Sequence, residues 1–248
     1  MIEIEKKFLI FSIKEICFAD YPFEVAGKDA VIFYDCKNKI EKDGFARKEF
    51  PTLIIDLTKD LEDIWRHMDR KSCRYMIQRA QKEGIKIRVD QDYDEFNEIN
   101  ASFRKKKDSG SVSDVKEYKN YGKLFTAEIG GEIVGGQFYL EDKQNIKWLL
   151  GASKRLEVEK EKAILIGCAN RLMIWEAIKY AKARGIKEFD LGGYYTGKMR
   201  NGQKEKINDF KKSFGGQPTT HYIYQKNYSK IYKLLSLLKK RLSRGHKL

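Results

Sequence analysis

Histidine and cysteine are scarce in this chain, which restricts the chemistry that its side chains can perform. Three histidines in 248 residues leave little for a histidine-based triad or a two-histidine metal site. The four cysteines form no C-x-x-C pair and have no close histidine for a zinc box. They are Cys17, Cys36, Cys73 and Cys168. We therefore expect no metal, and we expect these cysteines to be reduced thiols in the core.

Long hydrophobic runs are also missing. The longest wholly apolar stretch, near residues 163–169, is far too short to span a bilayer. The first residues do not have the basic, apolar and small-residue order of a secretory leader. We expect a cytoplasmic protein.

Positive charge, in contrast, is abundant. The 50 Lys and Arg residues outnumber 36 Asp and Glu, which gives a formal net charge of +14. Such a charge favours anionic partners such as tRNA, nucleotide diphosphates or anionic lipid, although a lysine-rich proteome would give the same balance. Because 42% of the residues are hydrophobic, with 14 Tyr and 14 Phe, we expect the chain to fold throughout.

The first third of the chain predicts short strands followed by a helix. The strands are expected at residues 6–13, 30–35 and 52–57. Thr58 or Asp60 is a suitable helix cap, and the helical apolar period continues until Gly84 ends it.

From residue 85 the pattern becomes strand, helix, three strands, long helix, strand. The expected ranges are 85–90, 93–107, 123–130, 131–142, 145–153, 159–185 and 186–191. This order predicts an α/β (α+β) fold with a mixed β-sheet flanked by helices. The long helix makes the strand after it parallel to the strand before it. A loop, a short helix at 207–213, a strand at 220–225 and a final helix from Tyr228 follow.

Three segments between residues 51 and 216 resemble one known family. The helix after the strand at 52–57 carries an R-x-x-I-x-x-A-x-x-x-G pattern that begins at Arg74 and ends at Gly84. Residues 172–193, "LMIWEAIKYAKARGIKEFDLGG", and residues 210–216, "FKKSFGG", supply the other two segments. Together they resemble the long helix, the following strand and the F-K-x-x-F-G-G element of the Fem-type (FemABX-like) peptidyl aminoacyltransferases of the GNAT superfamily.

The resemblance implies two tandem GNAT-like domains. Residues 1–88 would form an abbreviated N-terminal GNAT-like domain, completed by residues 219–248, and residues 89–218 would form a complete one. The implied activity is transfer of an amino acid from aminoacyl-tRNA to an amine of a peptidoglycan precursor or another peptide, without a further cofactor. The implied partners are tRNA and a nucleotide- or lipid-linked cell-wall precursor.

Lys211 is the main catalytic candidate. Aminoacyl transfer needs positive charge at the oxyanion that develops on the carbonyl, and the family pattern implicates the lysine of F-K-x-x-F in transfer. Phe210 and Phe214, four residues apart, would lie on one helical face and anchor it. The alternative is a surface lysine on an amphipathic turn.

Asp190 is the second catalytic candidate, at the end of a strand where α/β sheets usually present ligands. With Gly192 and Gly193 beside it, this carboxylate would accept the amine proton or order the loop, or would only cap a turn. Tyr194 and Tyr195 would line the substrate pocket, or pack as ordinary aromatic residues.

Four basic side chains are candidates for phosphate binding because arginine contacts phosphate in a bidentate way. Arg104 and Lys105 are the preferred pair, at the expected mouth of the second domain. For Arg74 and Arg79, helical salt bridges or solvent exposure give a simpler explanation.

The connection from Gly151 to Gly167 lacks the glycine-rich Q/R-x-x-G-x-G/A loop with which CoA-dependent GNAT enzymes bind a diphosphate. This favours aminoacyl-tRNA as donor over acyl-CoA. Two alternatives remain open: an acyl-CoA-dependent N-acyltransferase acting on an amino sugar or polysaccharide intermediate, and a non-catalytic tRNA- or lipid-binding module.

The tail at 228–248 has a leucine stripe with basic and no acidic residues. Such a helix can rest on an anionic membrane surface or tRNA, or can close the abbreviated first domain. We expect both packing and anion binding, which would place the protein at the membrane periphery.

Overall fold

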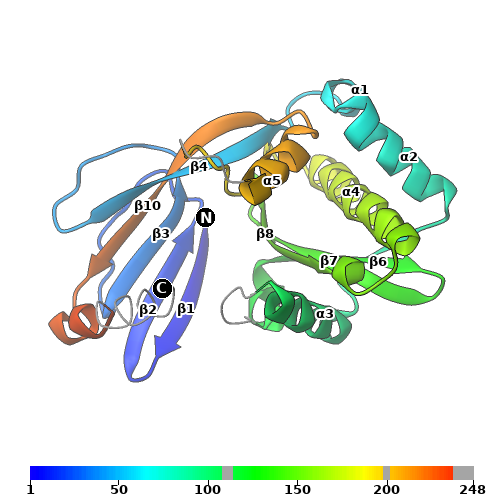
Figure 1. The fold of residues 1–248 in the computed structure, drawn as a ribbon. Helices are drawn as coiled ribbons and strands as arrows, with labels where there is room; N and C mark the ends of the chain where they lie inside the picture. The colour runs from blue at the N-terminus through cyan, green and yellow to red at the C-terminus, as the bar shows by residue number, and fades with distance from the viewer. Residues whose placement is uncertain (108–113, 198–201, 237–248) are drawn as a thin grey trace. The chain divides into compact units, whose positions relative to one another are not determined.

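A computed structural model describes residues 1–107, 114–197 and 202–236 of the chain. It divides into two compact units (Figure 1). Unit 1 comprises Met1–Pro51 with Thr220–Leu248, and unit 2 comprises Thr52–Thr219. The chain passes from one unit to the other along β4 (Ala46–Asp56) and β10 (Gln217–Asn227). Whether the two units correspond to tandem GNAT-like domains, with the boundaries predicted at residues 88 and 219, stays a prediction.

Unit 1 is built on β1 (Ile2–Phe8), β2 (Phe11–Cys17), β3 (Ala30–Cys36) and β10. β1 pairs with β2 antiparallel, β2 with β3 parallel, and β3 with β10 antiparallel. The prediction of one strand over residues 6–13 is wrong, because the chain turns between β1 and β2. Leu9 adopts a φ of 56° in this turn, a conformation for which its sequence gives no signal.

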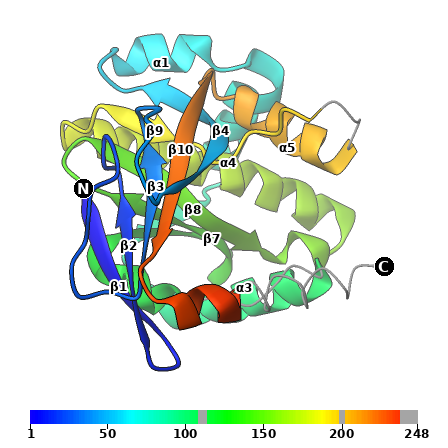
Figure 2. The same cartoon turned by 90° about the vertical axis from the view of Figure 1, so that its left-hand side faces the viewer.

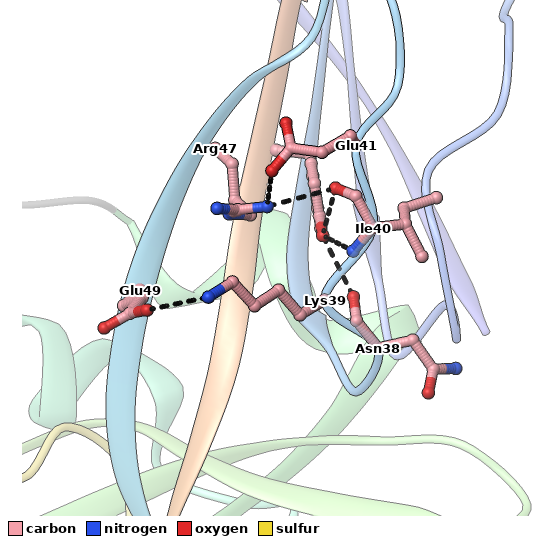
Figure 3. Close-up of polar contacts among 7 residues, drawn as sticks. Asn38, Lys39, Ile40, Glu41, Arg47 and Glu49 are labelled. Carbon is pink, nitrogen blue, oxygen red and sulfur yellow. Dashed lines mark hydrogen bonds and ion pairs between the residues drawn. The ribbon is translucent and has the colours of Figure 1, made fainter.

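A polar network fixes the segment before β4 in unit 1 (Figure 3). The Ile40 N–H donates to the hydroxyl of Tyr224 at 2.8 Å, and that hydroxyl lies 3.0 Å from the Asn38 carbonyl oxygen. Arg47 pairs with Glu41 and donates to the Ile40 carbonyl at 3.3 Å. One buried tyrosine of β10 thus satisfies main-chain groups that no strand pairs.

The sheet of unit 2 runs in the order β4-β9-β8-β7-β6-β5. Its further strands are β5 (Lys86–Val89), β6 (Gly122–Ile129), β7 (Glu132–Glu141), β8 (Asn145–Ser153) and β9 (Glu188–Asp190). The predicted hairpin at Gly130 and Gly131 is confirmed, with φ of 59° and 84° as a tight turn requires. β8 and β9 pair in parallel, as the intervening long helix predicts.

Helices cover both faces of this sheet. They are α1 (Leu61–His67), α2 (Tyr75–Lys82), α3 (Tyr93–Lys106), α4 (Lys160–Ala183) and α5 (Gly202–Lys212). α3 and α4 lie on opposite sides of β7 and β8, with α2 against α4 (Figures 1 and 2). Shorter helical turns occupy Arg70–Arg74, Val115–Tyr121 and Lys154–Leu156. The predicted mixed α/β fold is therefore confirmed.

The predicted continuous helix after residue 60 is wrong. Met68 is extended, with φ −71° and ψ 142°, and separates α1 from the π-helical turn that precedes α2. Asp60 stands at the N-cap of α1, but its side chain makes no capping bond. The break lets Asp69 accept the Ser72 N–H at 2.6 Å and start a second helical segment.

The core of unit 2 is aromatic at its centre. Phe125, Tyr139 and Phe189 are fully buried, with neighbouring ring centroids 5.4–5.6 Å apart. All four cysteines are buried and free, as predicted. Within the described ranges, no helix combines the length and apolarity needed to cross a bilayer.

Candidate active site

The candidate site lies where two parallel strands of unit 2 separate. β8 and β9 pair over three residues, ending at Lys147 opposite Asp190. β9 stops there, whereas β8 continues to Ser153 after a bulge at Leu149. Beyond this point the two strands are no longer paired, and Phe210 and Lys211 of α5 contact Trp148 and Gly193 there.

Asp190 organises the turn that follows β9. Its Oδ1 accepts the Gly192 N–H at 2.6 Å and the hydroxyl of Thr52 on β4. Gly192 adopts a φ of 76°, which a glycine tolerates without strain. This geometry supports the loop-ordering role that was considered for Asp190, and it places the exposed Gly193 next to the site.

Lys211 on α5 is buried, with 8% of its surface exposed. Its Nζ donates to the Gly193 carbonyl oxygen at 2.8 Å and lies 5.7 Å from the ring centroid of Trp148. Burial lowers the pKa of Lys211 to about 8; Asp190 opposes this shift and Lys147 reinforces it. The expectation of a surface lysine is thereby excluded, and a cation is held at the strand separation.

Phe210 and Phe214 flank this lysine along the chain. Their ring centroids lie 5.5 Å apart, Phe214 is fully buried in the core, and Phe210 faces Trp148 at 6.2 Å. The two rings pack together as expected, but Phe214 lies in the turn after α5 and not on a face of the helix, so its anchoring of Lys211 stays a prediction. A role of either ring in binding substrate stays a prediction.

Trp148 is a site residue that the sequence reasoning missed. Its ring lies over Gly151, where a Cβ would come within 2.8 Å of the ring, and its Nε1 donates to the Leu150 carbonyl at 2.9 Å. The available signal was a large aromatic residue three positions before a glycine in a strand, since a glycine there often marks a close approach.

Tyr194 and Tyr195 pack against the basic face of α5. Asn208 holds the Tyr195 main chain on both sides, through bonds of 3.0 Å to its N–H and 2.8 Å to its carbonyl. Lys212 lies 5.4 Å from the Tyr194 ring centroid. Both tyrosines are therefore fixed beside Lys211, as neighbours of the site.

Arg104 and Lys105 lie elsewhere, in the last turn of α3. Arg104 Nε is 3.5 Å from Asn100 Oδ1 on the same helix. Among the described residues, no contact joins either side chain to Lys211 or Asp190. Their phosphate-binding role stays a prediction without support from this geometry.

Two surface hollows of unit 2 share no residue with the site. One is lined by residues 90–95 with Lys116 and Lys119, and the other by residues 141–143 with Arg184 and Ile186. Neither is lined by Lys211, Asp190 or Trp148.

Helices on both faces of a mixed sheet, with a long helix joining two parallel strands that separate, define the GNAT class of acyltransferase folds. The model of the acetyltransferase (GNAT) domain family matches residues 68–212, which is more than half of the chain. The protein therefore belongs to this family.

Solved structures agree with that fold. A crystal structure of FemX is similar with a TM-score of 0.66 and 13% identity, over 94% of this chain and 85% of that one. The C-terminal domain of a putative lysylphosphatidylglycerol synthetase from Agrobacterium fabrum is similar with a TM-score of 0.54 and 11% identity, over 80% of this chain and 68% of that one. L-PGS from Bacillus licheniformis is similar with a TM-score of 0.53 and 14% identity, over 85% of this chain and 72% of that one. The comparison with curated proteins finds no match. At these identities the likeness concerns the fold alone.

Proposed function

We propose that this protein is a Fem-type aminoacyltransferase, which moves an amino acid from aminoacyl-tRNA to an amine of a peptidoglycan precursor or another peptide. The observation that carries the proposal is Lys211, buried at the strand separation with its Nζ directed to the Gly193 carbonyl. FemX, one of the similar structures, bears the name of the family that the sequence motifs resemble.

The chemistry is direct aminolysis of an ester. A neutral substrate amine attacks the ester carbonyl, the C–N bond forms, and the C–O bond to the ribose breaks. Lys211 stabilises the negative charge that develops on the carbonyl oxygen. The amine proton passes, by way of the substrate phosphate or Asp190, to the leaving ribose oxygen, which ends as a hydroxyl. The bonds from Gly192 and Thr52 to Asp190 make positioning of the turn its better supported task.

The start of α4 argues for tRNA over CoA as the donor. A GNAT diphosphate usually lies at this helix N-terminus, where free N–H groups face the ligand. Here the segment contains Glu157, Glu159 and Glu161 and no glycine between residues 152 and 166. Without a glycine, this connection offers no close-fitting loop of main-chain N–H groups for a diphosphate. The net charge of +14 suits a large polyanion such as tRNA.

The test is a transfer assay with charged tRNA and candidate cell-wall precursors, read by mass spectrometry for an added residue. Lys211→Met should abolish the product, and Lys206→Met, an exposed lysine of the same helix, should leave it unchanged. Equal product from both variants would remove Lys211 from the mechanism and favour a non-catalytic tRNA- or lipid-binding module.

A second candidate is an acyl-CoA-dependent N-acyltransferase acting on an amino sugar or polysaccharide intermediate. The acetyltransferase description of the matching family favours it. A thermal-shift experiment separates the two, because a ligand that binds the folded state raises the unfolding temperature. Stabilisation by CoA, together with failure of charged tRNA to yield product, would select this candidate.

A tail that contacts membrane or tRNA remains part of the proposal. Only residues 228–236 of this segment lie within the described ranges, where Tyr232 packs on Phe11 and Ile231 and Leu234 are exposed. Leu238 and Leu242 lie outside them. Deleting residues 237–248 should weaken binding to anionic liposomes or to tRNA, and unchanged binding to both would withdraw the tail from the proposal.

A further inference from the structure

Two arginine side chains lie against one turn of α4, beside the candidate site. Arg171 donates from Nη1 to the Gly167 carbonyl oxygen at 3.1 Å. The guanidinium carbon of Arg155, from the turn before α4, lies 3.6 Å from where a Cβ on Gly167 would stand. Two guanidinium groups therefore share the surface of a single glycine.

Arg79 on α2 belongs to the same group. Burial raises the pKa of the Cys168 thiol, and Arg79, Arg171 and Arg155 all act to lower it. All three arginines therefore lie close enough to Cys168 to influence its thiol. Arg74 is near the same group, because burial raises the pKa of the Cys73 thiol and both Arg171 and Arg74 act to lower it. We call Arg74, Arg79, Arg155 and Arg171 the arginine cluster.

The positive charge of the arginine cluster is only partly compensated within the described part of the chain. Besides its bond to Gly167, Arg171 donates from Nε to the Ser72 carbonyl oxygen at 2.5 Å, and burial lowers the pKa of its guanidinium group. Arg79 lies 3.8 Å from Glu83. For Arg155 no ion pair is seen among the described residues, and the buried Nε of Arg74 has no hydrogen-bond partner there.

One carboxylate other than Glu83 lies near the cluster. Asp69 senses Arg74, but its Oδ1 accepts both the N–H and the hydroxyl of Ser72 at 2.6 Å. These bonds use Oδ1 of Asp69 to cap the helical turn that begins at Arg70.

The cluster adjoins the candidate site through one aromatic ring. The Arg171 guanidinium carbon lies 4.8 Å from the Phe210 ring centroid, and Phe210 precedes Lys211 on α5. An anion on the cluster would thus lie next to the helix that carries Lys211.

We propose that the arginine cluster binds phosphate groups of the acyl donor. That the ligand is an acyl donor rests on the proposed function, whereas the phosphate site itself does not. The ligand chemistry is a phosphodiester or a diphosphate, which the 3′ end of a tRNA and CoA both offer. Arginine suits it because its planar fork donates two parallel bonds to phosphate oxygens.

The experiment measures binding without transfer. A fluorescein-labelled RNA acceptor minihelix ending in CCA is titrated by anisotropy with the full chain, over a series of salt concentrations, and CoA is titrated separately by calorimetry. The test variant is Arg155→Gln, because Arg155 is exposed and its loss leaves the core intact. The matched control is Lys179→Gln, which removes an equal charge from α4 twelve residues beyond Gly167.

Arg155→Gln should weaken RNA binding about tenfold and lower the slope of log affinity against log salt by about 1, whereas Lys179→Gln should change neither. Glu83→Gln should tighten binding by roughly twofold to threefold, because it frees Arg79 from a competing carboxylate. Loss in the RNA arm assigns the site to RNA phosphates, and loss in the CoA arm assigns it to a diphosphate.

Equal effects of Arg155→Gln and Lys179→Gln in both arms would overturn the phosphate site, as would absence of binding by the unaltered protein. Arginine-dependent binding without any transfer product would overturn the proposed function and leave the site standing. If transfer proceeds but binding does not depend on Arg155, the phosphate site is overturned and the proposed function is kept.

Discussion

Removing the charge of Lys211 should stabilise the protein while it destroys transfer. Lys211 has a pKa of about 8 in the folded chain against 10.5 for an ordinary lysine. A shift of this size means that charging the buried amine costs about 3 kcal/mol more in the folded state than in the unfolded state. Lys211→Met keeps the length of the side chain and removes that cost, but loses the bond to the Gly193 carbonyl, worth about 1 kcal/mol.

The net gain is about 2 kcal/mol in the free energy of unfolding at pH 7, or a rise in Tm of roughly 4–8 °C for a chain of this size. This gain in unfolding free energy depends on pH. Because the folded pKa lies below the unfolded one, the unfolded state binds more protons between about pH 8 and 10.5, so the stability of the unaltered protein rises with pH over that window. The advantage of Lys211→Met should therefore vanish by about pH 10.5.

Calorimetric or denaturant unfolding of both proteins at pH 7 and pH 10 measures the two differences, with Lys206→Met as the control on the same helix. Transfer by the unaltered protein should fall as pH rises through about 8, when the ammonium loses its proton. A variant that is no more stable than the parent at pH 7, or whose advantage is the same at both pH values, would refute the argument that burial of this cation is costly.

Three other substitutions test the packing around the site and in unit 1. Gly151→Ala should cost about 1–3 kcal/mol in unfolding free energy because its Cβ would come 2.8 Å from the Trp148 ring, and most of that cost should disappear in the double variant with Trp148→Ala, as a double-mutant cycle would record. Tyr224→Phe should cost about 1–3 kcal/mol and speed hydrogen exchange near residues 38–40, since the Ile40 N–H loses its acceptor. Gly167→Ala should raise Tm by roughly 2–4 °C, because alanine is more favourable than glycine in a helix interior by about 1 kcal/mol. The added Cβ would lie 3.6 Å from the Arg155 guanidinium carbon, an ordinary contact distance, so a lower Tm would show that the added methyl group clashes with Arg155.

The sequence was informative where local chemistry decides the structure. Gly130 and Gly131 predicted their hairpin because two successive positive φ angles are cheap only for glycine. The apolar period of residues 160–183 predicted α4, and with it the parallel pairing of β8 and β9.

It was silent where tertiary contacts decide. The turn at Leu9 contains no glycine, proline or asparagine, and both Leu9 and Ile10 are exposed, so the run of apolar residues predicts one strand where the chain forms two. The break at Met68 has no breaker residue, because the side chain of Asp69 creates it by starting a new helix. The meeting of Arg155 with Gly167 joins two elements and leaves no local pattern.

The electrostatics of the candidate site agree with the proposed transfer chemistry. Lys147 and Lys211 are both buried beside the end of β9, and each acts against the charge of the other, while Asp190 compensates only in part. A fold under no constraint would replace such a pair with apolar side chains of similar size, because that substitution usually gains stability. Such a cost is typical of functional sites, where a shifted pKa or a buried positive charge takes part in the reaction. Here the positive charge would stabilise an oxyanion that forms only during the reaction and is absent from the resting structure.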